Sequence, residues 1–164
     1  MTRRIRKARG FSLVELVIVI VIIGVIAAIA VPRLSRGAKG ARDSALRGNL
    51  AVLRNAIDLY SAEHAGKFPT VGGFVAELTT YSDEGGTTGP ALDGATGKIY
   101  GPYLKAVPGL PIAGVGTTGG KVGDTTVAAA DGLGVGWIYT ALTGDIVANT
   151  GTAKDEKTTL YSDY

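Results

Sequence analysis

The sequence predicts an α+β chain in which a long N-terminal α-helix, membrane-spanning in its first half, packs against a small antiparallel β-sheet head with long loops. Three observations support this fold class. An apolar run with a single carboxylate fills residues 11–31, and apolar side chains recur at helical spacing over residues 46–60. Glycine accounts for 25 of the 164 residues and threonine is frequent, which is typical of a loop-rich β region rather than a helical bundle.

The N-terminal residues predict a membrane span that follows a basic leader. Residues 1–10 carry five arginine or lysine side chains, whereas residues 11–31 carry Glu15 as their one charge. These 21 residues would form about 30 Å of helix at roughly 1.5 Å per residue, which matches the hydrocarbon core of a bilayer. The basic residues favour a cytoplasmic N-terminus. An unpaired carboxylate near lipid costs on the order of several kcal/mol, so Glu15 is expected to have a partner or a function.

The string Arg-Gly-Phe-Ser-Leu-Val-Glu-Leu at residues 9–16 resembles the class III signal sequence of type IV pilins and of the pseudopilins of type II secretion systems. The resemblance implies that a prepilin peptidase cuts between Gly10 and Phe11 and that Phe11 becomes the N-methylated N-terminus. It also implies that Glu15 pairs with the N-terminal amine of a neighbouring subunit. Such a charge pair in a dry helical bundle would select one axial register. Gly24 and Pro32 fall where family members commonly carry a helix glycine and proline.

The resemblance implies a structural filament subunit rather than an enzyme, closest to the major, G-like pseudopilin of a type II secretion system. Implied partners are other copies of the chain in a helical homopolymer, minor pilins or pseudopilins, the prepilin peptidase, the inner-membrane assembly platform, and the membrane before assembly. The subunit would span the bacterial inner membrane once, with its head in the periplasm, and then enter a periplasmic or cell-surface filament. The short head, the absence of paired cysteines and the Gly101–Leu104 segment favour a pseudopilin.

Other interpretations remain open from sequence. A type IV pilus subunit for adhesion, motility or DNA uptake is the alternative, and a membrane-anchored module that binds calcium or glycans is a third hypothesis. The N-terminus could also be a secretory signal peptide cut after residues 28–30 or a plain anchor, although the apolar run is long and opens with a carboxylate. Glu15 could simply extend toward the lipid headgroups.

Charge and composition exclude several classes of function. The chain carries a formal charge of +3, but without the five basic residues of the leader, twelve basic residues face fourteen acidic ones. The mature chain therefore gives no support for nucleic-acid binding. The absence of cysteine excludes disulfides and thiolate metal sites, and one histidine, His64, makes histidine-based catalysis improbable. We expect His64 to be a packing or capping residue. No nucleophile elbow or phosphate-binding loop is present.

The predicted organisation has four segments: a cleaved basic leader at 1–10, a transmembrane and assembly helix at 11–32, an amphipathic helix at 33–66 that continues into the head, and a loop-rich β-sheet head at 67–164. Pro32 is expected to kink or melt the helix, and Gly37 and Gly40 to weaken it further. We expect Gly66 to be the C-cap. The apolar stripe should lie against a sheet and comprises Leu46, Leu50, Leu53, Ile57 and Tyr60; the other side is assigned to Arg47, Arg54, Asp58 and Ser61.

Within the head, the sequence predicts few strands. Residues 67–97 are interpreted as a connecting loop with a short apolar patch at 74–78, and residues 115–126 as an exposed loop. Alternating polarity over 136–140 and 145–149, across a Leu-Thr-Gly turn, predicts a β-hairpin. Residues 158–161 are a candidate last strand. Trp137 and the tyrosines are expected in the core and at its rim.

No cofactor is required by this interpretation, but calcium is a candidate ligand because the C-terminal loops are rich in carboxylates. The sequence lacks the regular acidic spacing of a helix–loop–helix calcium site, which favours solvated surface charges. The candidate ligands are Asp83, Glu84, Asp93, Asp124, Asp131, Asp145, Asp155 and Glu156.

Overall fold

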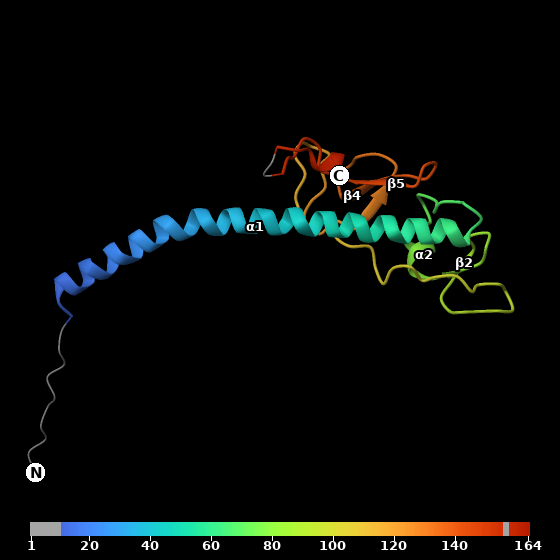
Figure 1. The fold of residues 1–164 in the computed structure, drawn as a ribbon, viewed down its shortest axis with the longest axis horizontal. Coiled ribbons are helices and arrows are strands. Elements are labelled where there is room, and N and C mark those ends of the chain that lie inside the picture. Colours follow the sequence, from blue (N-terminus) through green and yellow to red (C-terminus); the bar gives the residue numbers. More distant parts are fainter. Residues whose placement is uncertain (1–10, 156–157) are drawn as a thin grey trace, which may run out of the picture. The chain divides into compact units, whose positions relative to one another are not determined.

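The computed structural model describes residues 11–155 and 158–164, and it confirms an α+β fold with a long N-terminal helix (Figure 1). Helix α1 runs from Leu13 to Glu63, 51 residues, and continues through Pro32, Gly37 and Gly40. The single chain therefore contains no melted segment at these positions. Contacts divide the chain into two compact units between Ala38 and Lys39.

Helix α1 ends in a left-handed turn. The Gly66 N–H donates to the Ser61 carbonyl at 2.9 Å, and both Ala65 and Gly66 have positive φ angles, 53° and 79°. This bond spans five residues, as in the Schellman termination of a helix, so Ala65 occupies the first left-handed position and Gly66 the second. The predicted C-cap at Gly66 is thus displaced by one residue, while Pro69 follows as expected of a residue that cannot continue a helix.

The hydrophobic core of the second unit is built on the predicted stripe of α1. All five members of the stripe are at most 3% exposed, and they pack with Trp137, Tyr139 and Ile146. Burying one leucine or isoleucine side chain contributes about 1.5–3 kcal/mol relative to leaving it in water, so this stripe holds the helix to the head. Strands β4 and β5 lie along the second half of α1 (Figure 1).

The core strands form one three-stranded sheet. Strands β4 (Val135–Thr140) and β5 (Asp145–Ala148) pair antiparallel with Thr140 opposite Asp145, which confirms the predicted hairpin. Strand β3 (Thr126–Ala128) pairs parallel with β4, so this sheet is mixed and differs in that one strand from the antiparallel sheet that the sequence predicted. Alternating polarity places residues on one face or the other in either kind of pair, and it therefore cannot determine strand direction.

Three short elements lie where the sequence predicted only a loop. Helix α2 (Phe74–Thr79) buries Phe74 and Leu78, and strands β1 (Tyr81–Ser82) and β2 (Thr88–Gly89) form a two-stranded antiparallel sheet. The apolar patch is helical because its buried residues are four positions apart and face the core together. Strands of two residues are too short to leave an alternation signal.

The chain ends in a 3₁₀ helix, η1 (Tyr161–Asp163), and not in the strand predicted over 158–161. Lys154 and Leu160 form only an isolated β-bridge. The aromatic side chain of Tyr161 is 4% exposed and its hydroxyl donates to the Asp43 carboxylate on α1. This contact joins residues far apart in the sequence, and no local pattern indicates it.

Some polar residues of α1 do not lie where the sequence placed them. Arg54 was expected to face away from the core, but its Nη2 donates to the Ile146 carbonyl of β5 at 3.2 Å. Arg47 likewise extends toward the C-terminal residues, with its Nη2 2.7 Å from the Tyr164 hydroxyl. Long side chains at the border of a buried stripe can reach polar groups while their stems cover apolar surface.

His64 continues the buried stripe as a packing residue. Its Nδ1 donates to the Tyr60 carbonyl at 2.8 Å, and its Nε2 lies within hydrogen-bond distance of the Ser82 hydroxyl, at 2.9 Å. The imidazole also stacks on the Tyr60 ring with centroids 3.7 Å apart. Both ring nitrogens are thereby used inside the head.

A matched pair of leucines on α1 tests the role of the stripe. Leu53 is fully buried, whereas Leu59 is 56% exposed on the same helix. We expect Leu53→Ala to lower the free energy of unfolding by about 2–5 kcal/mol and Leu59→Ala to change it by less than about 0.5 kcal/mol. Urea denaturation of the detergent-solubilised chain, followed by Trp137 fluorescence, measures both. Equal losses in the two variants would show that the stripe is not the core.

The buried tyrosines predict loss of stability in alkali. Burial raises the pKa of Tyr60 to about 12, and it raises the pKa of Tyr103, Tyr139 and Tyr161 further. The folded state therefore favours neutral phenols, and this stabilisation is complete below the ordinary pKa near 10 and is lost as the pH rises through 12. We expect the free energy of unfolding to fall over that range, with tyrosinate absorbance appearing in separate steps. A single titration step near pH 10 for all seven tyrosines would contradict this.

Candidate assembly site

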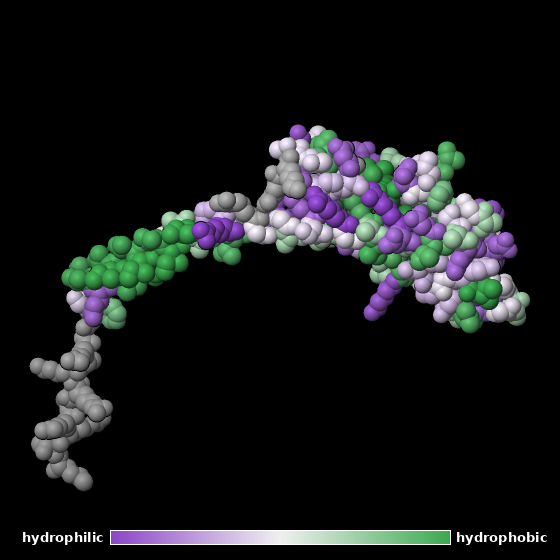
Figure 2. Space-filling view, viewed as in Figure 1, coloured by the Kyte–Doolittle hydropathy of each residue, from purple (hydrophilic) through white to green (hydrophobic). Residues whose placement is uncertain are grey.

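The first half of α1 exposes a continuous apolar surface. Every leucine, valine and isoleucine from Leu13 to Val31 is between 44% and 78% exposed. Figure 2 shows this surface as an uninterrupted hydrophobic band. Among the described residues, α1 is the one helix long and apolar enough to cross a membrane, with a mean hydropathy of 3.2 over its best 18 residues. An apolar surface of this extent requires cover by lipid or by other apolar helices.

Glu15 lies in the first turn of this helix and has a partner within its own chain. Its Oε2 accepts a hydrogen bond from the Ser12 backbone N–H at 2.9 Å. With Ser12 at the N-cap and Glu15 three residues later, this is the glutamate half of a capping box, and the positive end of the helix dipole favours the carboxylate there. The Ser-x-x-Glu pattern of residues 12–15 is a sequence signal for this contact that our interpretation of Glu15 did not use.

One capping bond uses only part of the acceptor capacity of a carboxylate, which can accept up to four. Phe11, the predicted first residue of the mature chain, is 79% exposed. Gly10, on the other side of the predicted cleavage point, lies outside the described residues. The structure thus places Phe11 and Glu15 at the open N-terminal end of α1, where both are accessible to a partner.

The helix-weakening residues of α1 are not explained by packing within the chain. A Cβ atom added at Gly24 or at Gly37 would meet nothing within 4 Å, and Pro32 is exposed. Gly40 is half-buried, and its carbonyl accepts from the Ser44 hydroxyl at 2.9 Å. Glycine at positions 24 and 37 therefore leaves room on the helix surface that nothing in the single chain fills.

The second unit presents an outward face on α1, opposite the core stripe. Its members are exposed and uncharged, and they recur at spacings of 4, 3, 4, 3 and 4 residues, the repeat with which two helices pack along a seam. Val52 and Leu59 are 50% and 56% exposed, and an added Cβ at Gly48 would meet nothing within 4 Å. This outward face comprises Ala41, Ala45, Gly48, Val52, Asn55 and Leu59.

The candidate calcium ligands are spread over separate loops. Asp83 accepts from the Thr87 backbone N–H at 2.8 Å, and Asp93 accepts from the Thr96 hydroxyl at 2.6 Å. These hydrogen bonds lower the pKa of both carboxyl groups. Each carboxylate thus stabilises a turn of its own loop.

Further along the chain, Asp124, Asp131 and Asp145 accept hydrogen bonds from Lys121, Thr118 and Thr143, respectively. Within residues 11–155 and 158–164, no three histidine or carboxylate groups come together as a metal site would require. Glu84 lines an open depression of about 400 Å³ together with Asp83, and Glu156 lies outside the described residues. Calcium binding stays a prediction.

Comparison with known families bears on the same N-terminal segment. Residues 5–31 match the family model described as the prokaryotic N-terminal methylation motif. The motif indicates a type IV pilin-like, prepilin-processed filament subunit. No curated protein and no solved structure matches the chain. The match includes Gly10, Phe11, Glu15 and Gly24, and it ends before Pro32.

For a pilin-like chain, the motif implies processing by a prepilin peptidase and assembly into a filament with other pilins. Pilin-like subunits are structural proteins and not enzymes. The leader together with the exposed apolar helix fits anchoring in a membrane. Residues 32–164 fall outside the match.

Proposed function

We propose that this chain is the major pseudopilin of a type II protein secretion system. The observation that carries the proposal is the prepilin-type motif at residues 5–31, whose helical part, from Leu13 to Val31, exposes all its leucine, valine and isoleucine side chains. The precursor enters the inner membrane through this helix, with the leader in the cytoplasm and the head in the periplasm. Cleavage after Gly10 and N-methylation of Phe11 follow.

Assembly then replaces lipid by protein around the first half of α1. Lipid chains are as apolar as leucine, so the exchange gains little from the hydrophobic effect and depends on close packing between helices. Open space at Gly24 and Gly37 and the small residues of the outward face allow such close approach. The outward face extends the packing surface into the head unit, because it carries no charge from Ala41 to Leu59.

Glu15 selects the axial register of the assembled helices. In the single chain its carboxylate accepts from the Ser12 N–H, which lowers the cost of holding the charge near lipid. In a filament, the N-terminal amine of a neighbouring Phe11 provides an opposite charge. A misaligned subunit would leave both charges buried without that partner, which costs more than the aligned pair gains.

Three features favour a pseudopilin over a type IV pilus subunit. The chain has no cysteine, its head is short, and residues 101–104 resemble a segment often seen in major pseudopilins. That segment packs within the head, where the backbone N–H groups of Tyr103 and Leu104 both donate to the Leu78 carbonyl at 2.9 Å. A type IV pilin for adhesion, motility or DNA uptake is the alternative. A membrane-anchored binding module would need no filament.

Processing is tested by intact-mass and N-terminal peptide mass spectrometry of the chain purified from its native membrane. We expect a mature chain that begins at N-methylated Phe11. A chain that begins at Val31 would indicate cleavage by an ordinary signal peptidase after Ala30, and the filament function would be excluded.

Two substitutions at Glu15 separate its charge from its capping hydrogen bond. We expect Glu15→Ala and Glu15→Gln both to abolish filaments while leaving membrane insertion and cleavage intact, because neither side chain carries the negative charge that pairs with an ammonium group. The side-chain amide introduced by Glu15→Gln still accepts from the Ser12 N–H, so this variant serves as the matched control for capping. Filaments are scored by electron microscopy after overproduction. Normal filaments from Glu15→Gln would show that assembly needs the capping hydrogen bond of Glu15 and not its charge.

Complementation distinguishes the two filament hypotheses with the same variants. A strain that lacks the chain is supplied with the wild type or with Glu15→Ala, and protein export, adhesion and motility are measured. Restoration of export by the wild type alone supports a pseudopilin. Restoration of adhesion or motility identifies a pilus subunit, and activity of Glu15→Ala equal to wild type indicates an anchored module.

A further inference from the structure

The C-terminal residues of the chain return to one short stretch of α1. The Tyr161 ring is buried, and its hydroxyl donates to the Asp43 carboxylate, 118 residues earlier in the sequence. Asp43 itself is only 7% exposed. A hydroxyl bonded to a buried carboxylate is a strong, charge-assisted contact. Removing the Tyr161 hydroxyl would deprive the buried Asp43 carboxylate of this hydrogen-bond donor, which is costly.

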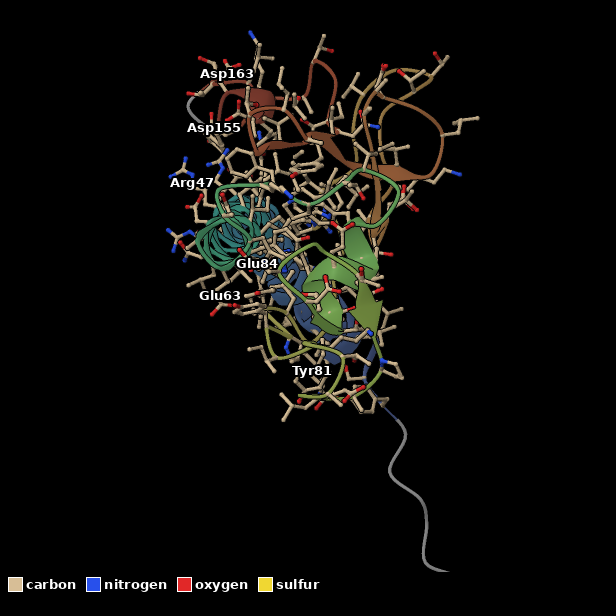
Figure 3. All side chains as sticks on the ribbon, turned by 90° about the vertical axis from the view of Figure 1, so that its right-hand side faces the viewer. Arg47, Glu63, Tyr81, Glu84, Asp155 and Asp163 are labelled. Atoms are coloured by element: carbon tan, nitrogen blue, oxygen red, sulfur yellow. The ribbon has the colours of Figure 1, made fainter. Side chains whose placement is uncertain are left out.

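A second contact lies one turn further along α1. Arg47 Nη2 is 2.7 Å from the Tyr164 hydroxyl and 3.4 Å from Asp155 Oδ2, and the Tyr164 hydroxyl donates to the same carboxylate. The Arg47 guanidinium carbon also lies 4.4 Å from the centre of the Tyr164 ring. Figure 3 shows Arg47 on α1 beside Asp155 of the C-terminal loop. We name Asp155, Tyr161 and Tyr164, with Asp43 and Arg47, the C-terminal clasp.

The clasp holds α1 at the point where the head begins to cover it. Among the described side chains, Asp43 is the first buried residue of α1 from its N-terminus, and Leu46 is the next. The division between the two units of the chain falls shortly before, between Ala38 and Lys39. The preceding stretch contains Pro32, Gly37 and Gly40, whose residue types are the least favourable in a helix.

We propose that the C-terminal clasp sets the boundary between two parts of α1 that open independently. N-terminal to Asp43, the helix contains residue types of weak helix propensity, and none of its described side chains is fully buried, so its backbone hydrogen bonds open without unfolding the core. From Asp43 onward, the clasp and the apolar stripe keep the backbone hydrogen bonds of the helix from opening. A conformational change in residues 33–42 therefore stops at the clasp instead of spreading into the head. This proposal does not depend on the filament function.

The other end of the head provides a matched control. The Tyr103 hydroxyl donates to Glu63 Oε2 at 2.5 Å, so a second tyrosine–carboxylate bond holds the last turn of α1. Tyr161→Phe and Tyr103→Phe each remove one hydroxyl from a contact with α1. Both keep the ring and its apolar packing, and they act at opposite ends of the same covered helix.

The test is amide hydrogen exchange with mass spectrometry on the full chain in lipid nanodiscs. In the wild type, residues 33–42 are expected to exchange faster than residues 46–60. Tyr161→Phe should accelerate exchange over residues 43–49 by roughly five- to a hundredfold, the effect of losing one buried hydrogen bond, and leave residues 53–60 unchanged. Tyr103→Phe should accelerate amide exchange only near residue 63. Arg47→Gln removes the second contact of the clasp and should act over the same residues as Tyr161→Phe.

Three results would overturn the proposal. One is equal protection of residues 33–42 and 46–60 in the wild type, which would mean that no boundary exists. Another is unchanged exchange over residues 43–49 in both Tyr161→Phe and Arg47→Gln. The third is faster amide exchange throughout the head in Tyr161→Phe. If that variant does not fold, faster exchange throughout the head in Arg47→Gln counts as the same result. In that case the clasp would belong to the core and would not act as a local boundary.

Discussion

The structure depends on how each part of α1 is covered, because one continuous helix must satisfy two different surroundings. In its first half every large apolar side chain is exposed, and the backbone N–H and C=O groups form their hydrogen bonds within the helix itself. Backbone groups paired in this way tolerate lipid and a bundle of other helices equally well. In its second half one stripe is buried by the strands of the head. The head is thus built around one side of this helix, and the outward face from Ala41 to Leu59 stays exposed.

Two polar contacts on this helix have different physical roles. At the N-terminus, Glu15 holds the Ser12 N–H and remains accessible, so its environment can change when another chain arrives. Near the start of the head, Asp43 is buried and bonded to Tyr161, so its environment is complete within the chain. An accessible carboxylate can select a partner, whereas a buried and paired one restricts the conformation of its own chain.

The loops of the head are ordered by their own carboxylates. Asp83, Asp93 and Asp124 each accept a backbone N–H within four residues, the usual way in which aspartate stabilises a turn. These hydrogen bonds stabilise the turns whether or not a cation is bound. Three of the acidic residues that suggested calcium thus have a local structural role in the head.

The sequence by itself determined α1, its buried stripe, the β4–β5 hairpin and the prepilin-type N-terminus, because periodicity and the residue 9–16 string are local signals. Only the tertiary structure decided that β3 pairs parallel with β4, that residues 74–79 form a helix, and that Arg54 turns back to β5. The Tyr161–Asp43 bond joins residues 118 positions apart. Strand direction and distant polar pairs depend on how the chain returns on itself, and no spacing within a short stretch of sequence encodes that return.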